Sequence, residues 1–587
     1  MQKRELEEGS SKADARGVVV MMKKGERAGL LDCWRSRFRD YLGKYHVFLS
    51  ADMIDRSLVQ DILASNCIAG LMIVDPESKV DPTEALSHDG ACPNPKSGIY
   101  EDGCTSTSLW NEKGYVLPDG LRNIDWNMQI LYLFNKTHID AIKKCHDLFN
   151  VPKDGAPFVS FPFCAASFGV FSTAAGSSEI CYRRSKPWSR LFDVSIENKD
   201  DLCSPLVGVS IMAYLPPKVY NATATPHTAK YLMLCTRIDS FGIIPEISPG
   251  EISVLTSVIA LLATTRSIGQ HLDVFERAAN TSGRHVIVAF FDGESFDYIG
   301  SSDAAYDMMN DEFPRKLRMD LKAQLDPVIA SQLDSIVEVQ QLGTGDGSAS
   351  LYALADGRQF EKGELKHLLK ALTAGATAAG GSLNAPTAKS RVPPASWHSF
   401  ARHEPSIRGV VLAPFRDEYN YRRVNSILDR AQWTSAQRSA AITEVLVAAS
   451  AMLRAAADHV GLDTAQQMAL DIDKDFVSHS QVTSLFECFI DEPDWFKCDF
   501  FNKLNGGRFK ASTGYDFSNG TYSTWTESLY SIDNLRLYLV EQESFEKVML
   551  GLGIVIAIVS FLVVGRCNEE SFIIDEGERL AEEGEPL

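Results

Sequence analysis

Positive charge is scarce in this chain of 587 residues, where 58 Lys and Arg stand against 77 Asp and Glu and give a net charge of −19. Phosphate binding needs clustered Lys and Arg, so this balance argues against a nucleic-acid partner. Metal-ligand spacing is also missing, because the 12 histidines are scattered along the chain. An apolar leader is missing as well: residues 1–43 hold only the short run Val18–Met22, which is too short for a secretory signal core.

Long uncharged runs are rare too, and one stands out. Val548–Gly565 is 18 residues long, carries no charge and lies between Lys547 and Arg566. As a helix it would span about 27 Å, close to the hydrocarbon thickness of a bilayer. We predict a transmembrane helix at 548–565, followed by an acidic cytosolic tail at 566–587. Gly551 and Gly553 within the run either admit a neighbouring helix or are simply tolerated.

Four N-glycosylation sequons precede this run and none follows it, which favours a luminal or extracellular N-terminal portion. The expected acceptors are Asn135, Asn221, Asn280 and Asn519. A luminal portion requires a targeting signal, so we expect the natural N-terminus to be missing from this sequence.

The cysteines agree with an oxidising compartment, because eight of them form loop-length couples. The couples are Cys92 with Cys104, Cys145 with Cys164, Cys181 with Cys203, and Cys488 with Cys498. The sequence leaves their connectivity open. Cys67 and Cys235 lie in apolar runs and are predicted to be buried thiols, while Cys33 has no assignment.

Apolar runs with strand character alternate with helical patterns. The predicted strands are His46–Leu49, Ile68–Val74, Gln129–Phe134, Tyr231–Cys235, His285–Phe291 and Gly409–Ala413. A helix at Ser253–Thr265 between two of them predicts a parallel βαβ unit, and the clearest helix is Thr434–Val460. Ala371–Pro394, rich in Ala, Gly, Thr and Pro, is predicted to be a long flexible loop. The fold class is therefore α/β, with two lobes expected at 1–200 and 201–545.

The stretch Phe290–Ser301, FFDGESFDYIGS, follows one of these strands. Sites in open α/β sheets lie at the carboxyl ends of strands, so Glu294 should occupy such a place. A single acid there, with Ser295 where a second acid would be expected, suggests a binding surface descended from an enzyme.

This stretch, with Asp297, Tyr298, Ile299, Gly300 and Ser301 intact, and the later run Tyr522–Ser528 (YSTWTES) closely resemble the nicastrin family. The resemblance covers most of the chain, from about Gly17 to Ile574. It implies a luminal domain of two lobes, the larger one similar to zinc aminopeptidases and glutamate carboxypeptidases. It also aligns Trp110 with a small-lobe motif, either as an anchor between the lobes or as a plain core tryptophan.

The resemblance allows the metal-ligand positions of those peptidases to be compared with this chain. A histidine ligand becomes Arg237, a bridging Asp becomes Ser253, and the second acid of the Glu-Glu pair becomes Ser295. A last histidine aligns near Asn420. These substitutions remove the imidazoles and the charge that a divalent site needs, so we expect neither a metal nor another cofactor.

Two roles for Glu294 remain open at the sequence level. Supported by Tyr298, it could face the free N-terminus of a membrane-protein stub and accept hydrogen bonds from its ammonium group. Alternatively it pairs with Arg237 and holds two strand ends together.

The resemblance implies a non-catalytic subunit of the γ-secretase complex that recognises or sterically gates type I membrane-protein stubs and supports complex assembly. The implied partners are presenilin, which carries the catalytic aspartates, and the two smaller γ-secretase subunits. The implied location is a single-pass type I position in endoplasmic reticulum, Golgi, plasma and endosomal membranes. The alternative is an active aminopeptidase-like membrane peptidase.

Overall fold

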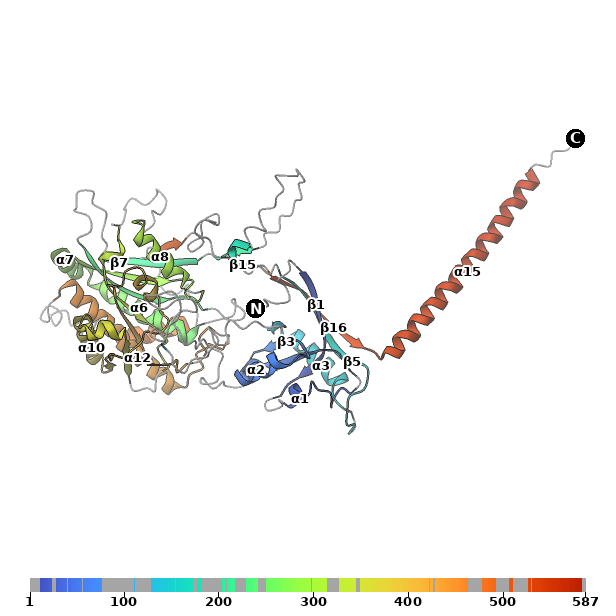
Figure 1. Cartoon of the computed structure of the whole chain (residues 1–587), viewed down its shortest axis with the longest axis horizontal. Helices are drawn as coiled ribbons and strands as arrows, with labels where there is room; N and C mark the ends of the chain where they lie inside the picture. The colour runs from blue at the N-terminus through green and yellow to red at the C-terminus, as the bar shows by residue number, and fades with distance from the viewer. Residues whose placement is uncertain are drawn as a thin grey trace.

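The structure is a computed structural model of the whole chain. The residues it describes are 11–23, 28–39, 41–54, 56–75, 110, 128–153, 155–172, 177–180, 203–206, 208–216, 229–240, 250–296, 298–313, 327–344, 349–421, 423–425, 428–462, 478–491, 506–509, 526–528 and 530–582. These form two lobes, and a long C-terminal helix projects from the smaller one (Figure 1).

Within the described ranges, the smaller lobe is built on a six-stranded sheet with the order β16-β5-β1-β2-β3-β4. Its strands are β1 (Ser11–Met21), β2 (Tyr45–Ser50), β3 (Ile68–Val74), β4 (Gln129–Leu133), β5 (Phe163–Ser172) and β16 (Tyr530–Val540). Strands β1 to β4 are parallel, while β5 runs antiparallel to both β1 and β16. Its helices are α1 (Ala28–Leu31), α2 (Arg56–Ala64) and α3 (Lys136–Phe149).

The larger lobe is built on an eight-stranded sheet, counted over the same residues, with the order β12-β11-β13-β10-β8-β9-β7-β14. Its strands are β7 (Gly208–Leu215), β8 (Lys230–Arg237), β9 (Arg284–Phe291), β10 (Leu333–Val339), β11 (Ser350–Leu354), β12 (Ser382–Asn384), β13 (Arg408–Ala413) and β14 (Gly506–Phe509). The four central strands are parallel, so their carboxyl ends share one edge. A short ladder joins β6 (Cys203–Pro205) to β15 (Thr526–Ser528).

Helices cover both faces of the larger sheet (Figure 1). One face is covered by α6 (Thr256–Gln270), α7 (Leu272–Ser282), α10 (Lys366–Ala378), α12 (Ser435–Val460) and α14 (His479–Phe486). The other face carries α8 (Ile299–Met309) and α11 (Trp397–Ala401). Shorter turns are η1 (Ala51–Met53), η4 (Glu251–Leu255), η5 (Ala330–Gln332), α9 (Gly357–Glu361) and η6 (Glu487–Asp491). The apolar faces of these elements make a three-layer α/β/α core.

The predicted strands and the two predicted helices are confirmed. The βαβ unit is present as β8, α6 and β9, with β8 and β9 parallel. Helix α12 begins after Thr434, which forms a capping box with Gln437, and ends at Gly461 in the left-handed conformation. Both ends follow the capping rules that the sequence displays.

The flexible loop predicted at Ala371–Pro394 is wrong, because residues 366–378 form α10 and residues 382–384 form β12. Alanine is the strongest helix former, so an Ala-rich run can be a packed helix as well as a loop. Gly375 is part of the packing: a Cβ there would collide with the Ser450 carbonyl and the backbone of Ala451 on α12. This glycine allows two helices to approach closely, and it does not mark a loop.

The predicted extent of the large lobe, 201–545, also needs correction at its end. Strand β16 pairs with β5 over Tyr530–Val540 and therefore belongs to the sheet of the smaller lobe. The alternating pattern of this segment indicates a strand, but sheet membership depends on which edge is open. The chain thus returns to the small lobe just before the C-terminal helix.

Two disulfides join described cysteines. Cys145 is bonded to Cys164, as predicted, and links α3 to β5. Cys33 is bonded to Cys67, so the prediction of a buried Cys67 thiol is wrong. The apolar residues around Cys67 suggested a buried thiol. The fold instead brings Cys67, just before β3, beside Cys33, just after α1. Cys235 is a buried free thiol, as predicted.

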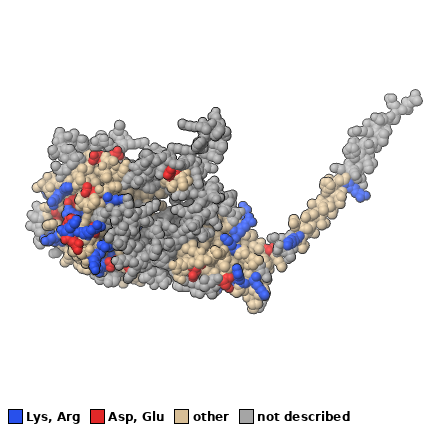
Figure 2. Space-filling model, in the orientation of Figure 1, with Lys and Arg blue, Asp and Glu red and all other residues tan. Residues whose placement is uncertain are grey.

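Helix α15 (Glu543–Glu582) contains the predicted membrane span. Its stretch Lys547–Arg566 has a mean hydropathy of 2.8 and none of it is buried. Figure 2 shows this stretch as an uncharged segment between two basic ends. Two other described helices, Glu251–Gln270 and Ser435–Val460, are apolar enough to span a membrane, but 83% and 72% of them lie inside the protein. Burial in the large-lobe core accounts for their composition.

Candidate functional site

The carboxyl edge of the larger sheet gathers the predicted site residues. Arg237 ends β8, and Glu294 and Ser295 follow β9 by a few residues. The next parallel strand, β10, contributes Glu338 near its end. Because the four central strands are parallel, these side chains from distant parts of the sequence meet at one edge.

Asp239 fixes the turn that carries Glu294. Its two carboxylate oxygens accept hydrogen bonds from the backbone N–H groups of Glu294, at 2.9 Å, and Ser295, at 2.8 Å. The Ser295 hydroxyl also donates to Asp239. A charged acceptor for two N–H groups holds a tight turn in one conformation. Ser295 therefore serves to hold this turn.

The motif at 298–301 forms the start of α8. Tyr298 lies in the left-handed region at φ 62° and precedes the first turn. Position 300 must be a glycine, because a Cβ there would collide with the Asp292 carbonyl. This close approach brings the first turn of α8 against the end of β9. Asp297 lies outside the described residues.

Glu294 is buried, with 3% of its surface exposed. Its carboxylate accepts hydrogen bonds from the Ser301 backbone N–H at 2.8 Å, the Ser301 hydroxyl at 2.8 Å and the Ser396 hydroxyl at 2.6 Å. Burial raises the pKa of Glu294 from 4.5 to about 8, while the bonds from Ser396 and Ser301 lower it. Glu294 thus joins the start of α8 to the start of α11.

Arg237 does not pair with Glu294 in the part of the chain that the structure describes, so the predicted strut between these two residues is wrong. The guanidinium instead donates from Nη2 to the Ser253 hydroxyl at 3.2 Å. Sequence could place Arg237 and Glu294 at one edge but could not orient their side chains. Glu294 does act as a strut, between two helices.

Arg237, Ser253 and Ser295, which the resemblance aligns with metal ligands of zinc peptidases, do not fit a zinc ion. A guanidinium carries a fixed positive charge and has no lone pair to offer a metal. Serine hydroxyls at 253 and 295 are already bonded to Arg237 and Asp239. Asn420, the fourth aligned position, donates to the Pro414 carbonyl at 3.2 Å. No three His, Cys, Asp or Glu side chains among the described residues gather as metal ligands would.

Glu338 is a site residue that the sequence reasoning missed. It is 2% exposed and accepts hydrogen bonds from Gln340 Nε2 at 2.7 Å and the Trp397 N–H at 3.3 Å. Burial raises the pKa of Glu338 to about 7, and the bond from Gln340 lowers it. A glutamate inside the apolar run IVEV was the available signal, because a charge within a central strand is rare without a partner.

Trp110 packs into the large lobe although it comes from the small-lobe part of the sequence. It is 3% exposed, and its ring lies 4.7 Å from Tyr419 and 5.9 Å from Phe415. It is a core tryptophan and a link between the two parts of the chain at once.

Of the predicted glycosylation sites, the described ones are exposed. Asn135 caps the start of α3, and Asn280 lies near the end of α7. Asn221 and Asn519 lie outside the described residues, as do Cys92, Cys104, Cys181 and Cys498. Cys203 lies in β6 and Cys488 in η6, and their side chains are outside the described part of the structure.

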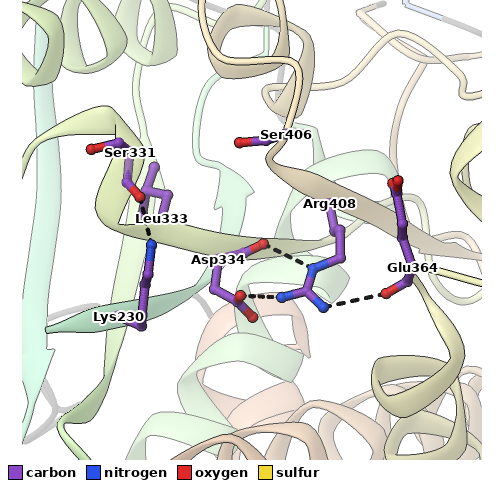
Figure 3. Close-up of a pocket in the computed structure, with 7 residues that line it drawn as sticks. All are labelled: Lys230, Ser331, Leu333, Asp334, Glu364, Ser406 and Arg408. Atoms are coloured by element: carbon purple, nitrogen blue, oxygen red, sulfur yellow. Dashed lines mark hydrogen bonds and ion pairs between the residues drawn. The ribbon is translucent and has the colours of Figure 1, made fainter. Parts of the chain in front are cut away.

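A polar cavity of about 290 Å³ opens at the opposite edge of the same sheet. Figure 3 shows its lining residues at the starts of β8, β10 and β13. Arg408 donates to the Asp334 carbonyl and the Glu364 carbonyl, both at 3.2 Å, and pairs with the Asp334 carboxylate. Lys230 donates to the Ser331 carbonyl at 2.9 Å. These cations already have partners, and the cavity is remote from Glu294.

The fold and the site define a class of protein: two α/β lobes with an apolar C-terminal helix. The larger lobe carries a buried carboxylate at the carboxyl ends of its strands, and no metal-binding residue set occurs among its described residues. Sequence comparison identifies the member of that class. The nicastrin small lobe matches residues 9–174 and the nicastrin large lobe matches residues 230–459. The chain belongs to the nicastrin family.

Individual relatives agree. Nicastrin of Caenorhabditis elegans is 35% identical, with 98% of this chain and 93% of the relative covered. Nicastrin of Homo sapiens is 29% identical over 66% of this chain and 52% of its own length. The crystal structure of the gamma-secretase component Nicastrin shares the fold, with a TM-score of 0.52 at 16% identity over 88% of this chain and 78% of that one.

Proposed function

We propose that this chain is a non-catalytic component of a γ-secretase complex, and that its larger lobe gates access of type I membrane-protein stubs to the protease. The observation that carries the proposal is the bond between Arg237 and Ser253, two former metal-ligand positions. The Arg237 guanidinium would repel a divalent cation placed near Ser253. The family membership reported above supports the same reading, since a relative of known structure is a gamma-secretase component.

The proposed partners are presenilin and the two smaller γ-secretase subunits, and the span at 547–566 is the proposed contact with the membrane. The lobes would then lie on the luminal or extracellular side, in secretory, plasma and endosomal membranes. The proposed glycans at Asn135 and Asn280 suit that side, because both residues are exposed.

Steric gating is favoured over direct recognition by Glu294. Glu294 is 3% exposed, and among the described residues Ser301 and Ser396 donate three hydrogen bonds to its carboxylate. An ammonium group of a substrate would have to displace a serine from a buried carboxylate, which costs free energy. A bulky lobe above the membrane needs no such contact to exclude tall ectodomains.

The experiment is co-purification of the full chain in mild detergent, followed by cleavage of stubs whose ectodomains increase in length. We expect a polytopic complex with an aspartyl protease, and cleavage that declines as the ectodomain lengthens. Glu294→Gln, which keeps the shape and one acceptor oxygen for the Ser301 N–H, should leave the length preference unchanged. Loss of short-stub binding in Glu294→Gln, with assembly intact, would favour recognition by Glu294 instead.

Metal analysis separates this proposal from the peptidase alternative. We expect no stoichiometric zinc in the purified chain and no hydrolysis of aminoacyl reporters. Stoichiometric zinc, together with turnover that Glu294→Gln abolishes, would overturn the proposal.

A further inference from the structure

A short segment of the large lobe reaches into the small lobe. Residues 428–431, here called the strap, lie in the sequence between β13 and α12 of the large lobe. Leu428 is 5% exposed and belongs to the small-lobe core, together with Val47, Leu58 and Leu71. Arg430 Nη2 lies 3.5 Å from Asp75 Oδ1 at the end of β3. Asp75 also accepts a hydrogen bond from Tyr132 of β4.

The alternate residues of the strap, Asp429 and Ala431, contact the large lobe. Asp429 is fully buried, and its carboxylate accepts hydrogen bonds from the Ile252 N–H at 3.1 Å and the Ser253 N–H at 3.3 Å. Ala431 N–H donates to the Glu251 carboxylate at 2.5 Å. Residues 428 and 430 thus contact one lobe and residues 429 and 431 the other, so one strap holds both lobes.

The strap supplies acceptors that η4 needs. The first N–H groups of a helical turn have no partner within the turn itself. Here the Glu251 N–H donates to the Asp429 carbonyl at 3.1 Å, and the next two N–H groups donate to its carboxylate. The Tyr421 hydroxyl also donates to the Asp429 carboxylate, at 2.8 Å. Removing Asp429 would leave buried donors without acceptors, which is costly.

The strap itself is braced and cannot easily stretch. The Arg430 N–H donates to the Leu428 carbonyl at 2.9 Å, and the Gln432 N–H donates to the Arg430 carbonyl at 2.9 Å. Each bond closes a three-residue turn. A displacement of Leu428 should therefore also displace the adjacent Asp429.

We propose that the strap couples two contacts. One is the contact of the small lobe with Leu428 and Arg430, and the other is the hydrogen bond between Ser253 and Arg237 in the large lobe. The contacts run from Asp75 through Arg430 and Asp429 to Ser253, whose hydroxyl holds Arg237. When the small lobe releases Leu428, Asp429 leaves η4, and the bond between Ser253 and Arg237 loses its support. This coupling is independent of membership in a γ-secretase complex.

Hydrogen exchange on the full chain in detergent tests the coupling, read by mass spectrometry on peptides that contain 251–256. Leu428→Ala should speed exchange in these peptides by roughly tenfold, because local opening exposes the N–H groups that Asp429 holds. Leu58→Ala is the matched control: it removes an equally buried leucine of the same core, at 1% exposure, outside the strap. Leu58→Ala should leave exchange at 251–256 unchanged.

Equal acceleration by both leucine variants would overturn the proposal, and so would unchanged exchange in Leu428→Ala. A charge reversal covers the case in which Leu428→Ala fails to fold. Arg430→Glu should repel Asp75 and speed exchange at 251–256, and adding Asp75→Arg should restore protection. Additive acceleration in the double variant would overturn the coupling.

Discussion

The Ser396 hydroxyl lies 2.6 Å from Glu294 Oε2 and ties α11 to the carboxyl edge of the large sheet. This contact holds the buried Glu294 carboxylate between two helices and stabilises their packing. The other partners of Glu294 are the N–H and hydroxyl of Ser301 on α8. Glu294 is therefore a structural acceptor, and its properties can be tested as such.

Gly300 should be intolerant of a side chain. Gly300→Ala places a Cβ against the Asp292 carbonyl and should reduce the free energy of unfolding of the large lobe by about 1–3 kcal/mol. Gly269→Ala on α6 is the control, since no atom lies within 4 Å of its added Cβ. This control should be neutral or stabilising by up to about 1 kcal/mol. Thermal unfolding of the two variants beside the wild type measures the contrast, and similar midpoints would contradict it.

Stability should fall as the pH rises through the titration range of Glu294. Its pKa is raised from 4.5 to about 8 by burial, so the folded state retains a proton that the unfolded state loses. The free energy of unfolding then decreases between about pH 4.5 and pH 8, because the folded state binds more protons there. Below this range the contribution is fully present, and above it the contribution is lost.

Glu294→Gln isolates this effect, because glutamine stays neutral at every pH. The variant should show a flatter decline of the thermal midpoint between about pH 5 and pH 8 than the wild type does. The control is Glu361→Gln, an exposed glutamate on α9, which should keep the wild-type slope. Identical slopes in all three proteins would show that Glu294 is ionised in the folded state at neutral pH.

The described cysteines should divide into bonded and free. Alkylation of the unfolded, unreduced chain should label Cys235 and spare Cys33, Cys67, Cys145 and Cys164. Replacing Cys33 and Cys67 together by serine opens a closure of 34 residues and should cost about 2–4 kcal/mol of stability. Labelling of Cys67 would contradict the first disulfide.

The two exposed sequons should carry glycans when the chain is made in eukaryotic cells. Thr137→Ala removes the first sequon and keeps Asn135, whose side chain accepts a hydrogen bond from the Thr137 N–H at 2.9 Å and caps α3. Ser282→Ala removes the second. Each change should remove one endoglycosidase-sensitive shift on a gel, whereas Thr137→Ser should retain it. Absence of any shift at both sites would argue against a luminal position of the lobes.

Much of the architecture follows from the sequence alone. Apolar runs such as Ile68–Val74 form buried strands, and Thr434 and Gly461 mark the ends of α12, because burial and capping are set by local residue types. The uncharged run before Arg566 stands out by length and hydropathy. The residue types at 237, 253 and 295 can be read directly as well, and a guanidinium and two hydroxyls are poor ligands for a divalent metal wherever they lie in space.

Tertiary structure decided what these residues do. Arg237 bonds Ser253 and leaves Glu294 to the serines, because side-chain partners depend on which helices pack over the sheet edge. Cys67 is bonded to Cys33, which lies 34 residues before it in the sequence. Strand β16 pairs with β5, the edge strand that the rest of the small-lobe sheet leaves unpaired on one side. Ala-rich residues 366–378 became a helix because α12 offered a surface to pack against. Which distant segments pair depends on how the whole chain packs, so local residue patterns do not determine it.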